Sequence, residues 1–239
     1  MRNIVNADDF GRSKTTNRAI SMCFKDGVIN RTTIMTNMPF FEEAIEISRN
    51  EGFFDKVGLH INLDDGEPLT NEMKANHHFC KDGRFIDRIF LKPKYRYILS
   101  PKDLRCIYIE VKAQMQKYID AGFPLKHFDS HHFVHNNISL IFVISHIGKK
   151  LGFKSARIME ISIYDSLMKK IYKEVLNTFL SNSFETTAQF VQSFENYDEN
   201  KGTAEFMTHP DIVNSKLVNI VSWNPEVYSS FDIYASFLR

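Results

Sequence analysis

Cysteine is scarce in this chain, and its placement excludes two kinds of site. The three cysteines, Cys23, Cys80 and Cys106, are far apart, odd in number and never part of a C-x-x-C pair. This pattern argues against a disulfide framework and against a thiolate metal site. We therefore expect a protein of a reducing compartment.

Long apolar runs and an excess of charge are also lacking. A short apolar stretch precedes Asp8, too short for a signal peptide, and no stretch approaches the roughly 18 residues of a membrane span. The formal net charge of the 239 residues is only +1, so no bulk field draws the protein to nucleic acid or to an anionic membrane. These absences predict a cytoplasmic protein that binds neither nucleic acid nor membranes.

Linkers, low-complexity tracts and internal repeats are missing as well, so no domain boundary is visible. A hydrophobic fraction of 43% and a charged fraction of 25% are typical of a soluble globular protein. We predict a single domain spanning residues 1–239, a length that is ordinary for one α/β domain. The 21 phenylalanines are expected to serve core packing more than sugar stacking.

The sequence does contain an alternation of short β-prone runs with segments of helical periodicity. The predicted strands span residues 3–7, 28–37, 56–63, 126–130, 155–159 and 204–208. The predicted helices span residues 14–26, 40–49, 101–121, 138–151, 166–180 and about 225–238. This alternation is typical of an α/β fold with parallel strands. Residues 64–100 are predicted to form an irregular loop excursion, which in a compact domain usually serves as a lid or a mobile segment.

Acidic or imidazole side chains follow four separate β-type runs, each at its carboxyl end. Asp8 and Asp9 follow the first run, and His60, His131 and His209 follow three others. In α/β barrels, active sites are built at this rim of the parallel sheet. The sequence therefore predicts that these side chains form one site.

The residue types at these strand ends point to a metal. Two imidazoles and one carboxylate are the ligand set of many catalytic zinc sites, with one position left open for water. Asp8 and Asp9 would point to opposite faces of an extended strand, so Asp9 can bind a metal only where the strand has ended or bent. Gly11 makes such a bend reasonable. We expect one divalent metal, zinc ahead of magnesium, because magnesium prefers oxygen ligands.

Each of these features also has an ordinary structural explanation. Asp8 and Asp9 could belong to a turn before a helix capped by Ser13, and His60 could be a hydrogen-bonded core histidine. The cluster of histidines could be a solvated loop; its members are His127, His131, His132 and His135. The combination of these groups at successive strand ends is what favours a functional site.

Four ordered segments carry a resemblance to a known family. They are Asn6-Ala-Asp-Asp-Phe-Gly11, Gly58-Leu-His-Ile-Asn-Leu63 with Gly66-Glu-Pro-Leu69, His127-Phe-Asp-Ser-His-His-Phe-Val-His135, and Thr208-His-Pro210. Through them, the chain resembles the YdjC-like carbohydrate deacetylases, a family that includes the chitooligosaccharide deacetylases. The resemblance implies a distorted (β/α) barrel, similar to a TIM barrel. It also implies a divalent metal and the removal of acetyl groups from small N-acetylated sugars.

Carried over by position, the resemblance assigns roles to individual residues. Asp9, His60 and His131 would bind the metal. Asp8 would act as the general base, and His209 as general acid or oxyanion partner.

Three further residues would support these groups. Arg157 would orient Asp8 or the substrate, and Asp129 and His135 would lie beside the ligands or contact the substrate. One position departs from the family pattern, which commonly reads Asp-Ser-His-x-His-x-His, because Phe133 replaces the middle histidine. A change in substrate range or rate is therefore expected more than a change in the metal site.

Two other functions remain open. One is a metal-dependent phosphoesterase that uses the same acid and imidazole groups, although few carboxylates besides Asp8, Asp9 and Asp129 lie at strand ends to bridge a second metal. The other is a sugar-binding protein that has lost efficient chemistry, with Phe133 as the mark of that loss. Surface Phe and Tyr on residues 64–100 would serve a homodimer interface or a lid, and the sequence does not separate these uses.

Overall fold

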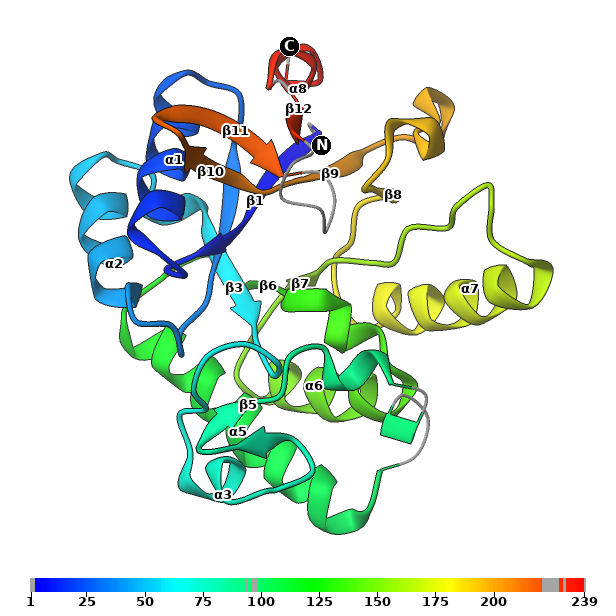
Figure 1. Ribbon diagram of the computed structural model, residues 1–239. Coiled ribbons are helices and arrows are strands. Elements are labelled where there is room, and N and C mark those ends of the chain that lie inside the picture. The colour runs from blue at the N-terminus through cyan, green and yellow to red at the C-terminus, as the bar shows by residue number, and fades with distance from the viewer. Residues whose placement is uncertain (1–2, 93, 96–98, 221–227, 230, 239) are drawn as a thin grey trace.

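The computed structural model describes residues 3–92, 94–95, 99–220, 228–229 and 231–238. Its main element is a seven-stranded sheet in the order β7-β6-β3-β2-β1-β9-β8, in which neighbouring strands are all parallel. The strands are β1 (Ile4–Phe10), β2 (Arg31–Ile34), β3 (Val57–Ile61), β6 (His127–Ser130), β7 (Ser155–Ala156), β8 (Gln189–Val191) and β9 (Ala204–Thr208). The sheet curls into a half-barrel with helices outside it, as Figure 1 shows. The predicted barrel-like α/β fold is confirmed.

Five helices begin and end within one residue of the predicted bounds. They are α1 (Lys14–Lys25), α2 (Phe41–Asn50), α5 (Pro101–Asp120), α6 (Ile138–Lys150) and α7 (Leu167–Ser181). In α5, the Ser100 hydroxyl accepts a hydrogen bond from the Asp103 amide, which satisfies one of the free N–H groups of the first turn. The helix ends before Gly122, whose φ of 86° few other residues adopt without strain.

Three parts of the chain differ from the prediction. β8 was not predicted, because its three residues are too few to show an alternating pattern. The chain after β9 forms an antiparallel sheet of β10 (Pro210–Val213), β11 (Lys216–Ile220) and β12 (Tyr228–Ser229). The predicted last helix is therefore wrong at Tyr228–Ser229, which pairs with β11, and only α8 (Asp232–Ser236) is helical there. The expected start of that helix at Asn224 lies outside the described residues.

Residues 64–100 are more regular than their composition predicts. They contain α3 (Asn71–Lys74), a hairpin of β4 (Cys80–Lys81) and β5 (Arg84–Phe85), and a 3₁₀ turn at Ile89–Leu91. The aromatic side chains expected on the surface of this segment point into the protein instead; Phe79, Phe85 and Phe90 are buried. The segment is therefore packed onto the body of the protein by its own small apolar core.

Most of the remaining core lies between the sheet and the helices, and phenylalanine fills much of it. Phe10, Phe53, Phe123, Phe128 and Phe206 are almost completely buried, which agrees with the expected use of this residue in packing. Among the described residues, no helix has the length and apolar character needed to cross a membrane.

Candidate active site

The candidate site lies at the carboxyl ends of β1, β3 and β6, where the parallel strands bring Asp9, His60 and His131 together. The predicted bend at Asp9 is present. The pairing of β1 with β2 shifts between Ala7 and Phe10, and Asp9 has a φ of 70°. A left-handed backbone costs a non-glycine residue roughly 1–2 kcal/mol, and here it turns the Asp9 carboxylate to the rim.

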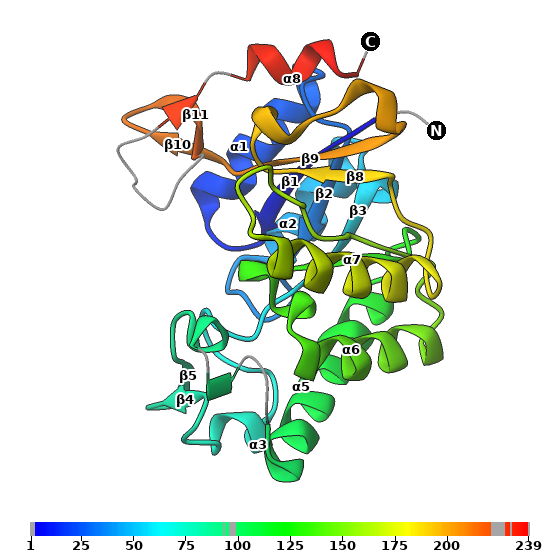
Figure 2. The same ribbon diagram turned by 90° about the vertical axis from the view of Figure 1, so that its right-hand side faces the viewer.

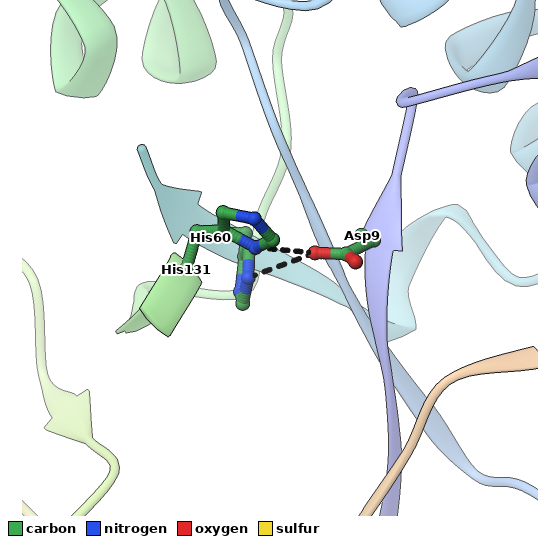
Figure 3. A group of neighbouring side chains, drawn as sticks. All are labelled: Asp9, His60 and His131. Carbon is green, nitrogen blue, oxygen red and sulfur yellow. Dashed lines mark ion pairs between the residues drawn. The ribbon is translucent and has the colours of Figure 1, made fainter. Parts of the chain in front are cut away.

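The three side chains converge on one point, as Figure 3 shows. Oδ1 of Asp9 lies 3.2 Å from Nε2 of His60 and 2.9 Å from Nδ1 of His131. One ligand atom from each residue lies within 4.8 Å of the other two, and all three side chains are buried. Oδ1 of Asp9 nevertheless accepts no aligned hydrogen bond from the described residues. Buried nitrogen and oxygen atoms that lie this close together without an aligned hydrogen bond are suitable ligands for a divalent cation.

Electrostatics at Asp9 favour its ionised form. Burial raises the pKa of this carboxyl group, but attraction by His131 and His60 outweighs burial and holds the pKa well below its usual range. Arg12, a residue that the sequence analysis missed, adds a contact of 3.3 Å from Nη1 to Oδ2. Asp9 is therefore a carboxylate at neutral pH, which is the form that binds metal ions.

Asp129 fixes the orientation of His60. Its Oδ1 lies 2.7 Å from Nδ1 of His60, and Thr33 donates a hydrogen bond of 3.0 Å to its Oδ2. With Nδ1 directed at a carboxylate, Nε2 of His60 is the nitrogen that faces Asp9. Burial lowers the pKa of His60, but Asp129 more than offsets this and raises it to about 10. A bound cation would have to displace that proton.

A fully buried arginine holds the neighbouring carboxylate, Asp8. Arg157 donates to both Asp8 oxygens, from Nη1 at 2.7 Å and from Nη2 at 2.8 Å. It also lies 2.7 Å from Asp129 and donates through Nε to Glu205 at 2.6 Å. Burial raises the pKa of Asp8, but Arg157 outweighs burial and lowers the pKa to about 2. Of the two roles expected for Arg157, its contacts match the orientation of Asp8.

His209 faces Asp8 from the other side of the site. It follows β9 directly, and its Nε2 lies 4.0 Å from Oδ2 of Asp8. About a third of its side chain is exposed, because the ring lines the cavity. Burial of the rest lowers the pKa of His209 below its ordinary value, although Asp8 and Asp9 oppose this shift. At neutral pH the ring is therefore mainly uncharged.

A cavity of about 590 Å³ opens in front of these groups, within the size range of small-molecule sites. Its wall includes Asp8, Asp9, His60, His131 and His209. His135 lies outside this wall. It is buried behind the rim, with Nδ1 2.5 Å from the Ser130 hydroxyl and Nε2 3.0 Å from the Arg157 carbonyl oxygen, and these contacts support the turn that contains His131.

Comparison with known proteins places the chain in a family. The family model described as YdjC-like protein matches residues 2–229. The chain belongs to the YdjC-like family. A carbohydrate deacetylase of Thermoanaerobacter pseudethanolicus is 32% identical over 228 residues, which cover 92% of this chain and 85% of that protein. Another, from Clostridium beijerinckii, is 29% identical over 223 residues, with coverage of 93% and 86%.

A solved structure supports the fold. It comes from Enterococcus faecalis, is assigned as a cellobiose-phosphate cleavage protein, and superposes with a TM-score of 0.68. The match covers 100% of this chain and 91% of the other, at 20% sequence identity. At that identity the likeness concerns the fold alone.

The sequence analysis missed two features of this YdjC-like site. Glu205 lies inside β9 and completes the set of acids around Arg157; a carboxylate within an apolar strand is the signal that could have revealed it. Asp64 lies 2.8 Å from Nδ1 of His132, whose ring packs on His131 with centroids 3.9 Å apart. No local sequence pattern predicts that Asp64 contacts His132, which lies far along the chain.

Phe133, which replaces a histidine of the common YdjC-like pattern, lines the cavity. His132 and Phe133 have φ values of 47° and 57°, so two successive left-handed residues turn the chain at the rim. The Phe133 ring packs against Phe190 with centroids 5.9 Å apart. The substitution therefore gives the cavity an apolar wall and leaves the Asp9, His60 and His131 cluster intact.

Proposed function

We propose that this YdjC-like protein is a metal-dependent deacetylase that removes acetyl groups from N-acetylated sugars or short oligosaccharides such as chitooligosaccharides. One observation carries the proposal. A three-ligand cluster, a separately held ionised carboxylate and an imidazole all meet at one cavity. The carbohydrate deacetylases among its relatives support the choice of a sugar as substrate.

Asp9, His60 and His131 would hold the metal. Because two of the three ligands are imidazoles, zinc is preferred over magnesium. When bound at such a site, a divalent ion polarises a carbonyl group and acidifies a water molecule. The protein supplies the remaining groups.

Asp8 would accept the proton of the attacking water. Arg157 keeps Asp8 ionised, and Asn6 donates a hydrogen bond of 2.7 Å to its Oδ1. Oδ2 is the oxygen nearer to His209, so we assign it as the proton acceptor. A carboxylate with so low a pKa holds a proton only briefly and passes it on.

His209 would then deliver a proton from Nε2 to the departing amine. Because its pKa is lowered, the ring begins uncharged and must first take a proton, and Asp8 is the nearest acid that can supply one. General acid catalysis of this kind contributes about 100-fold or more.

An acetate-release assay tests the proposal. Metal-stripped protein, and protein restored with zinc, magnesium or cobalt, are incubated with N,N′-diacetylchitobiose and a panel of other N-acetyl sugars. Metal-dependent release of acetate is expected, with zinc the best metal. Folded, metal-loaded protein that releases no acetate would overturn the proposal. In that case hydrolysis of p-nitrophenyl phosphate would favour a phosphoesterase, and sugar binding without turnover would favour a binding protein.

A further inference from the structure

A second group of possible metal ligands lies beside the cluster of Asp9, His60 and His131. It consists of Asp64, His131 and His132, and one ligand atom from each of these residues lies within 4.8 Å of the other two. We call this group the Asp64 cluster. All three of its residues line the cavity. It combines one carboxylate with two imidazoles, which is the same set of donors as in the first cluster.

The loop that follows β3 holds Asp64 in place. This loop leads into the segment with α3, β4 and β5, which lies beside α5, as Figure 2 shows. The side-chain oxygen of Asn62 accepts hydrogen bonds from the amides of Asp64, at 3.2 Å, and Asp65, at 3.0 Å. Asn62 is itself fixed, because its backbone N–H donates a hydrogen bond of 3.0 Å to the Gln114 side chain. The Asp64 carboxylate is therefore presented by a hydrogen-bonded turn.

Asp64 and His132 form a buried pair in which one carboxylate oxygen is unused. Oδ2 of Asp64 lies 2.8 Å from Nδ1 of His132, and the two side chains are 0% and 6% exposed. Oδ1 of Asp64 is also buried, but it accepts no hydrogen bond from the described residues. A buried carboxylate oxygen loses its hydration, so one without a partner indicates a place for an ion or a water molecule.

His131 has an unused nitrogen of the same kind. Its Nδ1 lies 2.9 Å from Oδ1 of Asp9, whereas its Nε2 is buried and makes no hydrogen bond with the described residues. Either ring nitrogen of a histidine is able to bind a metal ion. With Nδ1 directed at Asp9 in the first cluster, Nε2 is left for the Asp64 cluster.

The backbone turn that carries His132 is strained. His132 and Phe133 have φ values of 47° and 57°, and a left-handed backbone costs roughly 1–2 kcal/mol for each such residue. Strain of this kind is found most often at ligand-binding and active sites. Here the turn brings His132 to Asp64 and packs its ring on His131, with centroids 3.9 Å apart. The strained turn therefore assembles the Asp64 cluster.

We propose that the Asp64 cluster binds a second divalent cation, with zinc preferred, in addition to the one metal expected from the sequence. The two ions share His131, so no bridging carboxylate is required. The second ion should bind more weakly, because the first ion repels it and because it must displace the hydrogen bond between Asp64 and His132. It fills only at zinc concentrations well above those that saturate the first site. The proposal depends on the first cluster for the shared ligand alone, and on no step of the proposed deacetylation.

The number of zinc ions bound per chain tests the second site. Metal-stripped, full-length protein is dialysed against rising concentrations of free zinc, and bound zinc is measured by elemental analysis. The wild-type protein should bind two ions, whereas Asp64→Asn and His132→Gln should each bind only the stronger one. Both substitutions keep the approximate size of the side chain, and circular dichroism confirms that each variant is folded.

His78→Gln is the matched control. His78 also lies against a carboxylate, with Nδ1 3.1 Å from Asp103, but its side chain is 56% exposed and neither residue lines the cavity. This variant should keep both ions. A second ion that persists in both Asp64→Asn and His132→Gln, or that is lost in His78→Gln, would overturn the proposal.

Two further variants separate the second site from the proposed deacetylase. Asp9→Asn should lose the stronger ion and keep the weaker one, and His131→Gln, which removes the shared ligand, should bind neither. If Asp9→Asn keeps two ions while Asp64→Asn loses one, the second site is supported and the metal site of the proposed mechanism is contradicted. A single ion in the wild type that is lost in Asp9→Asn and kept in Asp64→Asn would overturn the second site and support the first.

Discussion

Asp8 and Asp9 are neighbours in sequence but have different partners in the structure. Asp8 binds Arg157, whereas Asp9 lies between two imidazoles. In a regular strand one of the two would point away from the rim. The left-handed backbone at Asp9 removes this conflict, so a single strand end provides both the carboxylate that we propose as a metal ligand and a second, separately held carboxylate.

Asp9→Asn should reduce bound metal and activity together, because a neutral amide is a far weaker ligand than a carboxylate. Metal content by elemental analysis and acetate release are measured on the same samples. Asp65→Asn alters another acid of the cavity wall that lies outside the ligand cluster, and it should keep its metal. Full metal occupancy with unchanged turnover in Asp9→Asn would contradict the ligand assignment.

Asp8→Asn should retain the metal but lower kcat by about 100-fold or more, because the amide cannot accept a proton. The measurement is kcat for acetate release at saturating substrate, together with metal content. Asp211→Asn, also on the cavity wall, is the control and should have a smaller effect. A kcat equal to that of the wild type would show that Asp8 is not the base.

His135 makes the stability of the fold depend on pH. Burial lowers its pKa from 6.5 to about 4, so between these values the unfolded chain binds a proton that the native ring does not. The stabilisation is present above pH 6.5 and is lost as the pH falls toward 4, by up to about 3 kcal/mol.

Urea unfolding at a series of pH values measures this loss. In His135→Asn the loss of unfolding free energy between pH 6.5 and 4 should be smaller than in the wild type, even though the variant is less stable at pH 7. His146→Asn makes the same change at an exposed position and should keep the wild-type slope. An identical slope in His135→Asn would rule out this histidine as the source.

At the scale of elements, α5 holds the 64–100 segment in place. The buried carboxylate of Glu110 accepts hydrogen bonds from the amides of Leu69 and Thr70 and from the Thr70 hydroxyl. Asp103, in the first turn of the helix, accepts a hydrogen bond from Asn76 at 3.0 Å. The described part of this segment is therefore attached to a long helix at two points, and it forms one wall of the cavity.

Glu110→Ala should loosen this wall. It leaves the partly buried amides of Leu69 and Thr70 without their acceptor, at a cost of up to about 1–3 kcal/mol each. Amide hydrogen exchange at Leu69 and Thr70 should become faster, while exchange in the central strand β1 changes less. Lys112→Ala, an exposed change on the same helix, is the control. Unchanged exchange at both amides would mean that other contacts hold the segment.

Across the whole molecule, the cluster of Asp9, His60 and His131 joins three strands, of which only β3 and β6 are neighbours in the sheet. β2 lies between β1 and β3, and Asp9, His60 and His131 come from β1, β3 and the turn after β6. The unfolded chain holds these groups far apart, so an ion that binds them binds the native state preferentially.

Zinc should therefore raise the free energy of unfolding, by about 2.7 kcal/mol when free zinc is about 100 times the Kd. Thermal and urea unfolding with and without zinc measure the effect. His60→Ala should abolish the stabilisation by zinc, and His209→Ala, outside the cluster, should preserve it. Equal stabilisation of His60→Ala would place the ion elsewhere.

Most helices and strands of this protein, and the residue types of its site, could be predicted from local sequence. Helices such as α5 were predictable because periodicity and capping depend on residues a few positions apart. The strand-end groups were predictable because parallel strands present their carboxyl ends at one rim. β8 and the β10–β11–β12 sheet were not, because strands this short or irregular carry little periodic signal.

Which of these groups come into contact depends on the folded arrangement of the strands and helices. The contacts of Glu205 with Arg157 and of Asp64 with His132 join segments far apart in the chain, and they exist only once the sheet is in register. The same holds for α7. Its sequence shows apolar residues on two sides, but only the packed fold determines that Met168, Ile171 and Val175 are the ones exposed. Sequence periodicity depends on residues close together in the chain. Contacts between distant residues depend on how all the strands and helices are arranged.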